Sequence, residues 1–330
     1  MFGFGQMIDM LKKSPKKIVF TEGQDPRILE AASRLLASYF LHPILVGEEE
    51  EIYDAAEESG YNIRGAEIIN PRTYKDMDAM VEKFCELRKS KGVTPQQARE
   101  TLQKGNYFGA MLVKMGLADS LLGGATYSTA DTVRPALQLI KTRPGNSIVS
   151  SCFILVRPSA TGENEVLAMG DCAINIKPTE DELVEIAIET TKCAKVFGID
   201  PKVAFLSYST FGSGEGEDVD KMRNAAKKTK EKYPELPVEG EMQFDAAVSV
   251  RVARTKCPDS EIAGHANTFI FPDINAGNIG YKIAQRLGHF EAYGPILLGL
   301  NAPINDLSRG CNATEVYSMA IVTAALACME

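Results

Sequence analysis

The sequence contains no tryptophan and only three histidines, His42, His265 and His289, which lie far apart among 330 residues. None of them has the spacing to a second ligand that a zinc site requires. Seven cysteines are present and no two are closer than 17 residues, so there is neither a Cys-x-x-Cys redox pair nor a zinc knuckle. Zinc-dependent hydrolysis and general-base catalysis by histidine are therefore poor explanations of function. The odd number of cysteines fits a reducing compartment.

The sequence also lacks an excess of positive charge and any long apolar run. Lys plus Arg total 36 and Asp plus Glu total 44, which gives a formal net charge of −8. Binding to nucleic acid or to an anionic membrane usually needs a basic surface, so neither is expected. No apolar stretch approaches the roughly 20 residues of a membrane span, and Asp9 interrupts an apolar start that has no basic leader. We expect a soluble, cytoplasmic protein.

Familiar nucleotide-binding and hydrolase motifs are missing as well. There is no Gly-x-x-x-x-Gly-Lys-Ser/Thr loop and no Gly-x-Ser-x-Gly elbow. The glycines at 212, 214 and 216 have the wrong spacing for a dinucleotide fingerprint, and the acids at 215, 217 and 218 would repel a pyrophosphate. We interpret this cluster as a surface turn between a strand and a helix, and the basic run at 227–232 as a solvated helix face.

What the chain does have is a regular alternation of short apolar runs and amphipathic stretches. Its 45% hydrophobic and 24% charged residues are typical of a globular protein, and its length suggests about two domains. We expect strands at 17–20, 43–47, 147–150, 152–156, 203–206 and 268–271. We expect helices at 26–36, 76–89, 96–104, 131–141, 181–197, 219–232, 278–286 and 315–328. This alternation predicts an α/β fold with mainly parallel sheets, and the turn at 144–146 is the best domain boundary on composition.

Three polar segments are not explained by the apolar pattern. Residues 123–136 form a glycine-rich loop, hydroxyl side chains and a helix start with Arg134, which together suit a phosphate or another anion. Residues 271–282 place Gly277 and Gly280 near a helix start, where they permit close approach of a ligand or of backbone. Residues 303–315 gather Asn, Asp, Ser, Arg, Cys and Glu before the last helix. A capped helix start and close packing are the simpler explanations of the first two segments.

These segments resemble the phosphate acetyl/butyryltransferase family, in which the chain looks like a phosphate acetyltransferase. The matching stretches span nearly the whole chain and are 22–29, 128–138, 243–247, 271–288 and 305–311. The resemblance implies reversible acetyl transfer between acetyl phosphate and coenzyme A, with inorganic phosphate as the other partner of the reaction. It implies no metal and no tightly bound cofactor, since coenzyme A is a substrate. It also implies a homodimer, and acetate kinase as the neighbouring enzyme.

The fold implied by the resemblance has two α/β domains with an active-site cleft between them, similar to isocitrate and isopropylmalate dehydrogenases. We place one domain at residues 1–146 plus 303–330 and the other at residues 147–302.

The chemistry needs a thiolate and stabilisation of an anionic tetrahedral carbon, because acetyl phosphate already carries a good leaving group. A free thiol has a pKa near ~8.5, so a positioned base helps at neutral pH. The resemblance assigns phosphate binding to Arg309, a hydrogen bond to the carbonyl oxygen or the thiolate to Ser308, and the base to Glu315, where relatives commonly have Asp. Asn312 and Glu315 also have the spacing of a capping box, so a purely structural role for Glu315 stays open. Asp306 is the next candidate base.

The resemblance further implies that Arg88 and Arg134 bind the phosphates of coenzyme A, although a solvated helix end also explains Arg88. We add Ser128, Thr129, Asn278 and Cys311 as substrate-binding candidates. An acetyl-cysteine intermediate on Cys311 is disfavoured, because no histidine lies in the motif and direct transfer needs no enzyme nucleophile. Phe211 stands where relatives often carry Lys, which argues against phosphate binding by that loop.

Other functions stay open at this point. Within the family, butyryl phosphate is the alternative substrate. A non-catalytic acetyl-CoA-sensing module of the same fold is a second alternative, against which the intact Ser308-Arg309 pair argues. A metal- and nicotinamide-dependent decarboxylating dehydrogenase is a third, but we find no cluster of metal-binding aspartates in the sequence.

Overall fold

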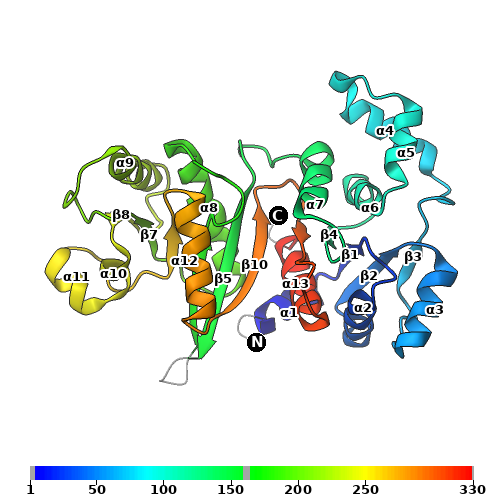
Figure 1. Ribbon diagram of the computed structural model, residues 1–330, viewed down its shortest axis with the longest axis horizontal. Helices are drawn as coiled ribbons and strands as arrows, with labels where there is room; N and C mark the ends of the chain where they lie inside the picture. Colours follow the sequence, from blue (N-terminus) through cyan, green and yellow to red (C-terminus); the bar gives the residue numbers. More distant parts are fainter. Residues whose placement is uncertain (1–3, 159–163, 329–330) are drawn as a thin grey trace. The chain divides into compact units, whose positions relative to one another are not determined.

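The computed structural model describes residues 4–158 and 164–328 (Figure 1). These residues form two compact units, each with its own sheet. We call residues 4–144 with 300–328 the parallel unit, and residues 145–299 the mixed unit. Within the described ranges, no helix is long and apolar enough to cross a membrane.

The parallel unit is built on a five-stranded sheet whose paired strands all run parallel, in the order β11-β4-β1-β2-β3. Its strands are β1 (Lys16–Phe20), β2 (Leu41–Val46), β3 (Glu67–Ile69), β4 (Ser120–Gly123) and β11 (Ile304–Asp306). β4 and β11 are fully buried. Their polar side chains are therefore buried as well, and that of Asp306 accepts hydrogen bonds from Thr129 and Thr132.

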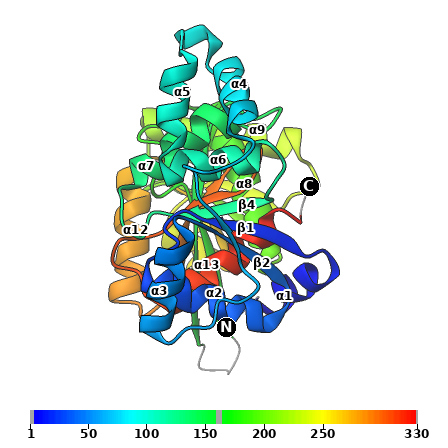
Figure 2. The same cartoon turned by 90° about the vertical axis from the view of Figure 1, so that its right-hand side faces the viewer.

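Helices cover both faces of this sheet, as Figure 2 shows. One layer contains α1 (Phe4–Lys13), α2 (Pro26–Ser38), α3 (Glu49–Ser59) and α13 (Ala313–Leu326). The opposite layer contains α4 (Met77–Leu87), a 3₁₀ turn (Lys89–Lys91), α5 (Pro95–Leu102), α6 (Gly105–Lys114), α7 (Thr129–Pro135) and a π turn (Ala136–Ile140). Gly109 of α6 allows close approach, because a Cβ there would lie 3.1 Å or less from side-chain atoms of Val19, Thr21 and Leu121. α13 is apolar almost all round and is buried.

The mixed unit has a six-stranded sheet in the order β10-β5-β6-β9-β7-β8. β5 (Ser150–Pro158) pairs antiparallel with β6 (Asn164–Gly170) and β10 (Glu291–Leu298). The other pairs are parallel and involve β7 (Val203–Leu206), β8 (Val238–Met242) and β9 (Thr268–Ile270). The predicted α/β class with mainly parallel sheets is confirmed.

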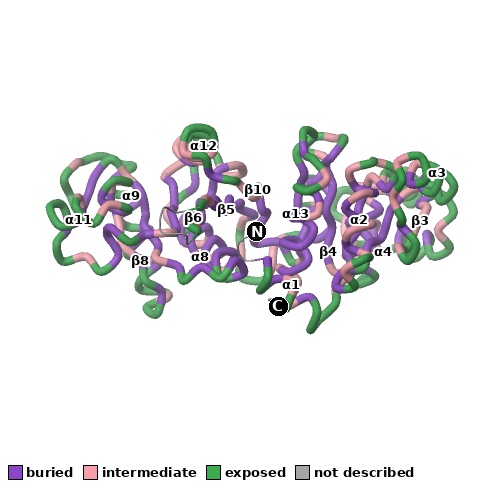
Figure 3. Tube along the Cα trace, turned by 90° about the horizontal axis from the view of Figure 1, so that it is seen from below, coloured by how far each residue is buried: buried purple, intermediate pink, exposed green. Residues whose placement is uncertain are grey.

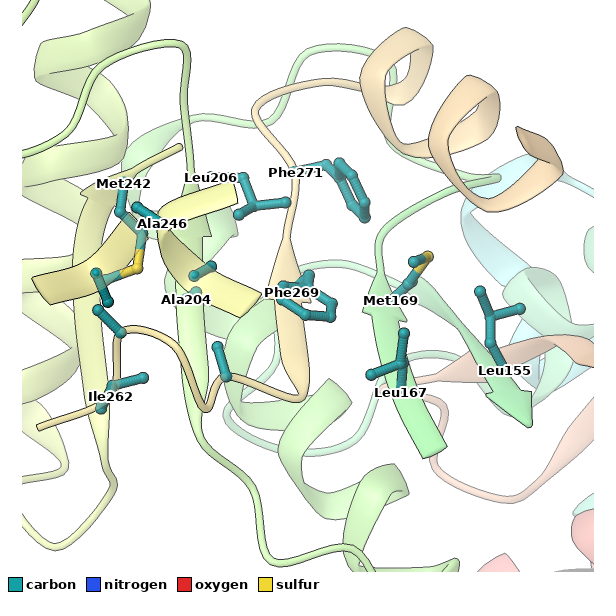
Figure 4. Close-up of a cluster of buried hydrophobic side chains, with 14 of the residues drawn as sticks. Leu155, Leu167, Met169, Ala204, Leu206, Met242, Ala246, Ile262, Phe269 and Phe271 are labelled. Atoms are coloured by element: carbon teal, nitrogen blue, oxygen red, sulfur yellow. The ribbon is translucent and has the colours of Figure 1, made fainter. Parts of the chain in front are cut away.

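Alternate residues of β7 build two separate cores. Val203 and Phe205 pack with α8 (Glu180–Val196) and α9 (Glu217–Lys232). Ala204 and Leu206 point to the other face, which packs against α10 (Phe244–Val248), α11 (Val250–Lys256) and α12 (Ile274–Arg286). Figure 4 shows this second core around Phe269.

Two predictions about secondary structure were wrong. The strand expected at 147–150 is absent, because the backbone N–H groups of Ser147 and Ile148 donate to the carboxylate of Glu185, at 2.8 and 3.3 Å. The helix expected at 131–141 is α-helical only to Pro135 and then widens into the π turn, where the Lys141 N–H donates to the Ala136 carbonyl. Proline removes one helical donor, which favours such a change in hydrogen-bond register.

Candidate functional site

Three loops of the parallel unit follow the carboxyl ends of the neighbouring strands β1, β4 and β11. They span residues 21–25, 124–128 and 307–312. The chain leaves β1 toward β2 on one side and returns to β4 on the other, so a topological switch point lies between β1 and β4. In open parallel sheets, ligands bind outside the carboxyl ends of the strands at such a point. The candidate site is therefore this loop cluster.

Arg27 joins all three loops. Its Nε and Nη2 donate to the two oxygens of Asp25, at 2.9 and 2.7 Å. Its Nη1 donates to the carbonyls of Arg309, at 2.9 Å, and Cys311, at 3.1 Å, and Nη2 also donates to the carbonyl of Ala125, at 2.9 Å. The carboxylate of Asp25 helps keep the pKa of Arg27 above its usual value. The guanidinium thus acts as a fixed connection between loops that are far apart in sequence.

Glu22 makes a second connection, between the first two loops. Its Oε1 accepts hydrogen bonds from the backbone N–H groups of Gly124, at 3.0 Å, and Thr126, at 3.1 Å, while Thr21 donates to Oε2. Burial raises the pKa of Glu22 and outweighs these hydrogen bonds, which lower it. The sequence stretch 22–29 belongs to the family resemblance, but the sequence did not indicate these roles for Glu22 and Arg27.

Asp306 connects the β11 loop to α7. Its two oxygens accept hydrogen bonds from the hydroxyls of Thr129, at 2.6 Å, and Thr132, at 2.5 Å. The carboxyl is buried, and burial raises its pKa. A Cβ on Gly124 would overlap Oδ1 of Asp306, so glycine is required at this approach. The structure thus places Thr129, a substrate-binding candidate, in a contact that positions the loop.

Ser308 and Arg309 are exposed directly after this buried strand. The hydroxyl oxygen of Ser308 accepts a hydrogen bond from the N–H of Gly310, at 3.2 Å. Within residues 4–158 and 164–328, the guanidinium of Arg309 has no hydrogen-bond or ion-pair partner, whereas its carbonyl is held by Arg27. An exposed arginine with a fixed backbone and a free side chain suits binding of a phosphate.

Glu315 forms the capping box that its spacing indicated. The backbone N–H of Glu315 donates to Oδ1 of Asn312, at 2.9 Å, and Oε2 of Glu315 accepts from the Asn312 N–H, at 3.1 Å. The Glu315 residue is nevertheless exposed, at the start of α13. Only one of its oxygens has a described partner, so the carboxylate keeps a lone pair for a second acceptor role.

Cys311 lies between Arg309 and Glu315 in the sequence, and its side chain is buried. Burial raises the pKa of its thiol, and the nearby Arg27 only partly opposes this. A raised pKa makes a cysteine a poor nucleophile at neutral pH. This argues against an acetyl-cysteine intermediate, as the sequence did.

Arg88 and Arg134 lie on different elements of the parallel unit, and the charges of both act on the pKa of Tyr107. Arg88 ends α4 and Arg134 lies in α7. Burial raises the pKa of Tyr107, and the charges of Arg134 and Arg88 oppose that shift. Arg134 also pairs with Asp131 at 3.5 Å, and Ser128 donates to Asp131 at 2.7 Å. The structure therefore connects Arg134 to Ser128 through Asp131, and no described hydrogen bond or ion pair joins Arg88 to either of them.

Asn278 belongs to the mixed unit. Its side-chain amide donates to the carbonyl of Cys172, at 3.1 Å, which ties α12 to the loop after β6. Gly277 makes the close approach that its sequence allowed, since a Cβ there would lie 2.7 Å from the carbonyl oxygen of Asp171. Asn278 thus has a structural contact, and its substrate-binding role stays a prediction. In the described parts of both units, no group of three or more His, Cys, Asp or Glu side chains could hold a metal ion.

Comparisons with known proteins cover almost the whole chain. A family model described as phosphate acetyl/butaryl transferase matches residues 4–324. The phosphate acetyltransferase of Bacillus subtilis (strain 168) is 55% identical over 311 residues, which is 94% of each chain. That of Staphylococcus aureus (strain Mu50) is 48% identical over 323 residues, or 97% of each.

Solved structures agree with these matches. A phosphotransacetylase from Streptococcus pyogenes is similar with a TM-score of 0.94 and 52% identity, covering 98% of each chain. A branched-chain phosphotransacylase from Enterococcus faecalis has a TM-score of 0.65 and 20% identity, covering 94% of this chain and 99% of that one, which shows a shared fold.

Proposed function

The chain belongs to the phosphate acetyl/butyryltransferase family, and we propose that it catalyses reversible transfer of an acetyl group between acetyl phosphate and coenzyme A. The observation that carries this proposal is the free guanidinium of Arg309, exposed in a loop whose backbone is fixed by Arg27. An acetyl-phosphate ligand would bring the anionic oxygens that such a donor fork recognises. Relatives at 48–55% identity carry the name phosphate acetyltransferase, which favours acetyl over butyryl transfer.

In the proposed reaction the sulfur of coenzyme A attacks the carbonyl carbon of acetyl phosphate. A carbon–sulfur bond forms, the bond from that carbon to the bridging phosphate oxygen breaks, and inorganic phosphate leaves. Arg309 holds the phosphoryl group and offsets its charge, and Ser308 donates to the carbonyl oxygen. Glu315 takes the thiol proton through its exposed carboxylate and returns it to the phosphate. Asp306 is less suited to this role, because its oxygens already accept from two threonines.

We assign the phosphates of coenzyme A to Arg88 and Arg134, which both belong to the parallel unit and which the family resemblance indicates. Ser128, Thr129, Cys311 and Asn278 are further substrate contacts in this proposal. Coenzyme A is a substrate here, and no tightly bound cofactor takes part. An acetate kinase would supply or consume the acetyl phosphate, and the cytoplasm is the proposed compartment.

We also propose that the protein is a homodimer. α12 carries Ile279 (58% exposed) and Ile283 (54%), and Leu287 (76%) follows just beyond its end, all at four-residue spacing. Figure 3 marks much of α12 as exposed. Three large apolar side chains in one stripe are typical of a surface that another molecule covers. Light scattering of the parent and of Leu287→Glu tests this, with a dimer expected for the parent and a lower mass for the variant. A monomeric parent would exclude it.

The catalytic proposal is tested by thioester formation from coenzyme A with acetyl, propionyl and butyryl phosphate in parallel. We expect the highest kcat/KM with acetyl phosphate. A preference for butyryl phosphate would make the protein a butyryltransferase. Absence of turnover with all three, while acetyl-CoA binds, would instead favour a non-catalytic acetyl-CoA-sensing module.

A further inference from the structure

A pocket of about 550 Å³ opens on the mixed unit, beside the edge strand β8. Arg223, Ala226, Lys227 and Lys230 of α9 line one part of it, and residues 256–260, at and just after the end of α11, line another. None of the lining residues belongs to the three loops of the candidate site. Its volume lies in the range of small-molecule sites.

Four basic side chains and two acidic ones, Glu239 and Asp259, line this pocket, so its lining is net basic although the whole chain is acidic. Arg223, Lys227 and Lys230 have the spacing of one face of α9, and Lys256 joins them from the end of α11. Arg223 is neutralised by the buried carboxylate of Glu241, at 2.9 Å, and Lys256 by an aspartate, at 2.9 Å. Lys227 reaches only an exposed glutamate of its own helix, at 3.9 Å. Lys230 has no ion pair within the described residues, so two ammonium groups remain available to an anion.

An aromatic ring stands at the same pocket. Phe211 is 50% exposed, and its φ of 46° is a left-handed conformation that bulky residues rarely adopt. Its backbone is held there, since the Phe211 N–H donates to the Glu241 carbonyl at 3.0 Å and the Gly212 N–H to the Glu241 carboxylate at 2.8 Å. An exposed ring fixed in this way offers a planar surface for stacking.

We propose that this pocket binds a nucleotide. The phosphates lie on Lys227 and Lys230, the base stacks on Phe211, and the carboxylate of Asp259 accepts from a sugar hydroxyl. This assignment gives a role to Lys227 and Lys230 of the basic run and to Phe211, none of which acetyl transfer uses. It is independent of the proposed acetyl transfer, because none of the pocket residues is among those assigned to that reaction.

Calorimetric titration of the full chain with ADP, and separately with inorganic phosphate, tests the site. The double variant Lys227→Ala/Lys230→Ala should raise the Kd for ADP at least tenfold. The matched control Lys195→Ala/Lys232→Ala removes the same charge from exposed positions of α8 and α9 outside the pocket and should stay within twofold. Phe211→Ala should weaken ADP binding and leave phosphate binding unchanged. Thioester formation by all three variants at saturating coenzyme A should match the parent, which checks that they are folded.

Two ligands contain the phosphates, sugar and base that this pocket would bind, namely a free nucleotide and the nucleotide portion of coenzyme A. A loss of affinity for coenzyme A in Lys227→Ala/Lys230→Ala would identify coenzyme A as the occupant. Unchanged affinity for coenzyme A, with ADP binding lost, would identify a free nucleotide. Absence of saturable ADP binding, or ADP binding that the double variant leaves unchanged, overturns the proposal.

Discussion

Replacing Arg27 with lysine keeps a positive charge beside Asp25 but removes the planar fork that joins three loops. A lysine ammonium is a single point of donation, so it can keep the pair with Asp25 but cannot also reach the three carbonyls that Arg27 serves. Each hydrogen bond of this kind is worth about 1 kcal/mol net. The free energy of unfolding of the parallel unit should therefore fall by about 3 kcal/mol. For a unit of this size, that lowers the Tm by on the order of 6–12 °C.

Measuring kcat distinguishes a role of Arg27 in positioning Arg309 from a role in stability alone. Because Arg27 holds the carbonyl of Arg309, its loss should displace that side chain, and a misplacement of about 1 Å costs on the order of 10²-fold in rate. We expect kcat to fall by about this factor at a temperature where the variant is fully folded. The KM for coenzyme A should change little, since Arg88 and Arg134 have no described contact with Arg27.

The matched control is Arg72→Lys, at an exposed arginine of the same unit. It should change the free energy of unfolding by less than about 0.5 kcal/mol and leave kcat unaltered. The measurements are thermal unfolding and steady-state thioester formation on all three proteins. A normal kcat in Arg27→Lys despite a lowered Tm would refute the positioning role. A normal Tm would refute the expectation that the three lost hydrogen bonds stabilise the unit.

The other predictions concern the substrate contacts. Arg309→Lys keeps the charge but loses the fork, so initial rates should fall about 10²-fold, and activity within threefold of the parent would contradict its role. Arg88→Ala and Arg134→Ala should raise the KM for coenzyme A far more than that for acetyl phosphate, whereas equal effects would point to a shared or structural role. Glu315→Gln can still accept the capping bond, so it should cost at most about 1 kcal/mol in stability but lower kcat by on the order of 10²–10⁴. Normal turnover of that variant at neutral pH would place the base elsewhere.

Much of the fold follows from local sequence. β1 and β7 were predicted because buried parallel strands are short, continuous apolar runs. β10 was missed because Gly294 and Pro295 interrupt it, and the structure accommodates them at a register shift between Tyr293 and Ile296. β4 and β11 were missed because neither is a continuous apolar run: β4 starts at Ser120 and ends at Gly123, and β11 contains Asn305 and Asp306.

In the candidate site, too, some residues could be predicted from the sequence and others could not. Arg309 and Glu315 were identified because polar residues crowd into one loop before an apolar helix and match the family there. Arg27 carries no comparable signal, since Asp25 and Pro26 before it mark only a helix start. Its partners Arg309 and Cys311 are 282 and 284 residues away. Only the parallel order β11-β4-β1 brings these loops together, and that order depends on the whole unit.

In the proposed site, Arg309 binds the phosphate and Arg27 holds the loop of Arg309 in place. A side chain that must bind a phosphate cannot also be locked by protein acceptors, because those contacts would neutralise it. Arg309 therefore needs its geometry from its backbone, and the chain turns from buried Leu307 to exposed Ser308 and Arg309 with no regular structure to hold it. Arg27 provides that support by binding the carbonyl of Arg309, while Asp25 neutralises the supporting guanidinium. The free charge at the site is then that of Arg309.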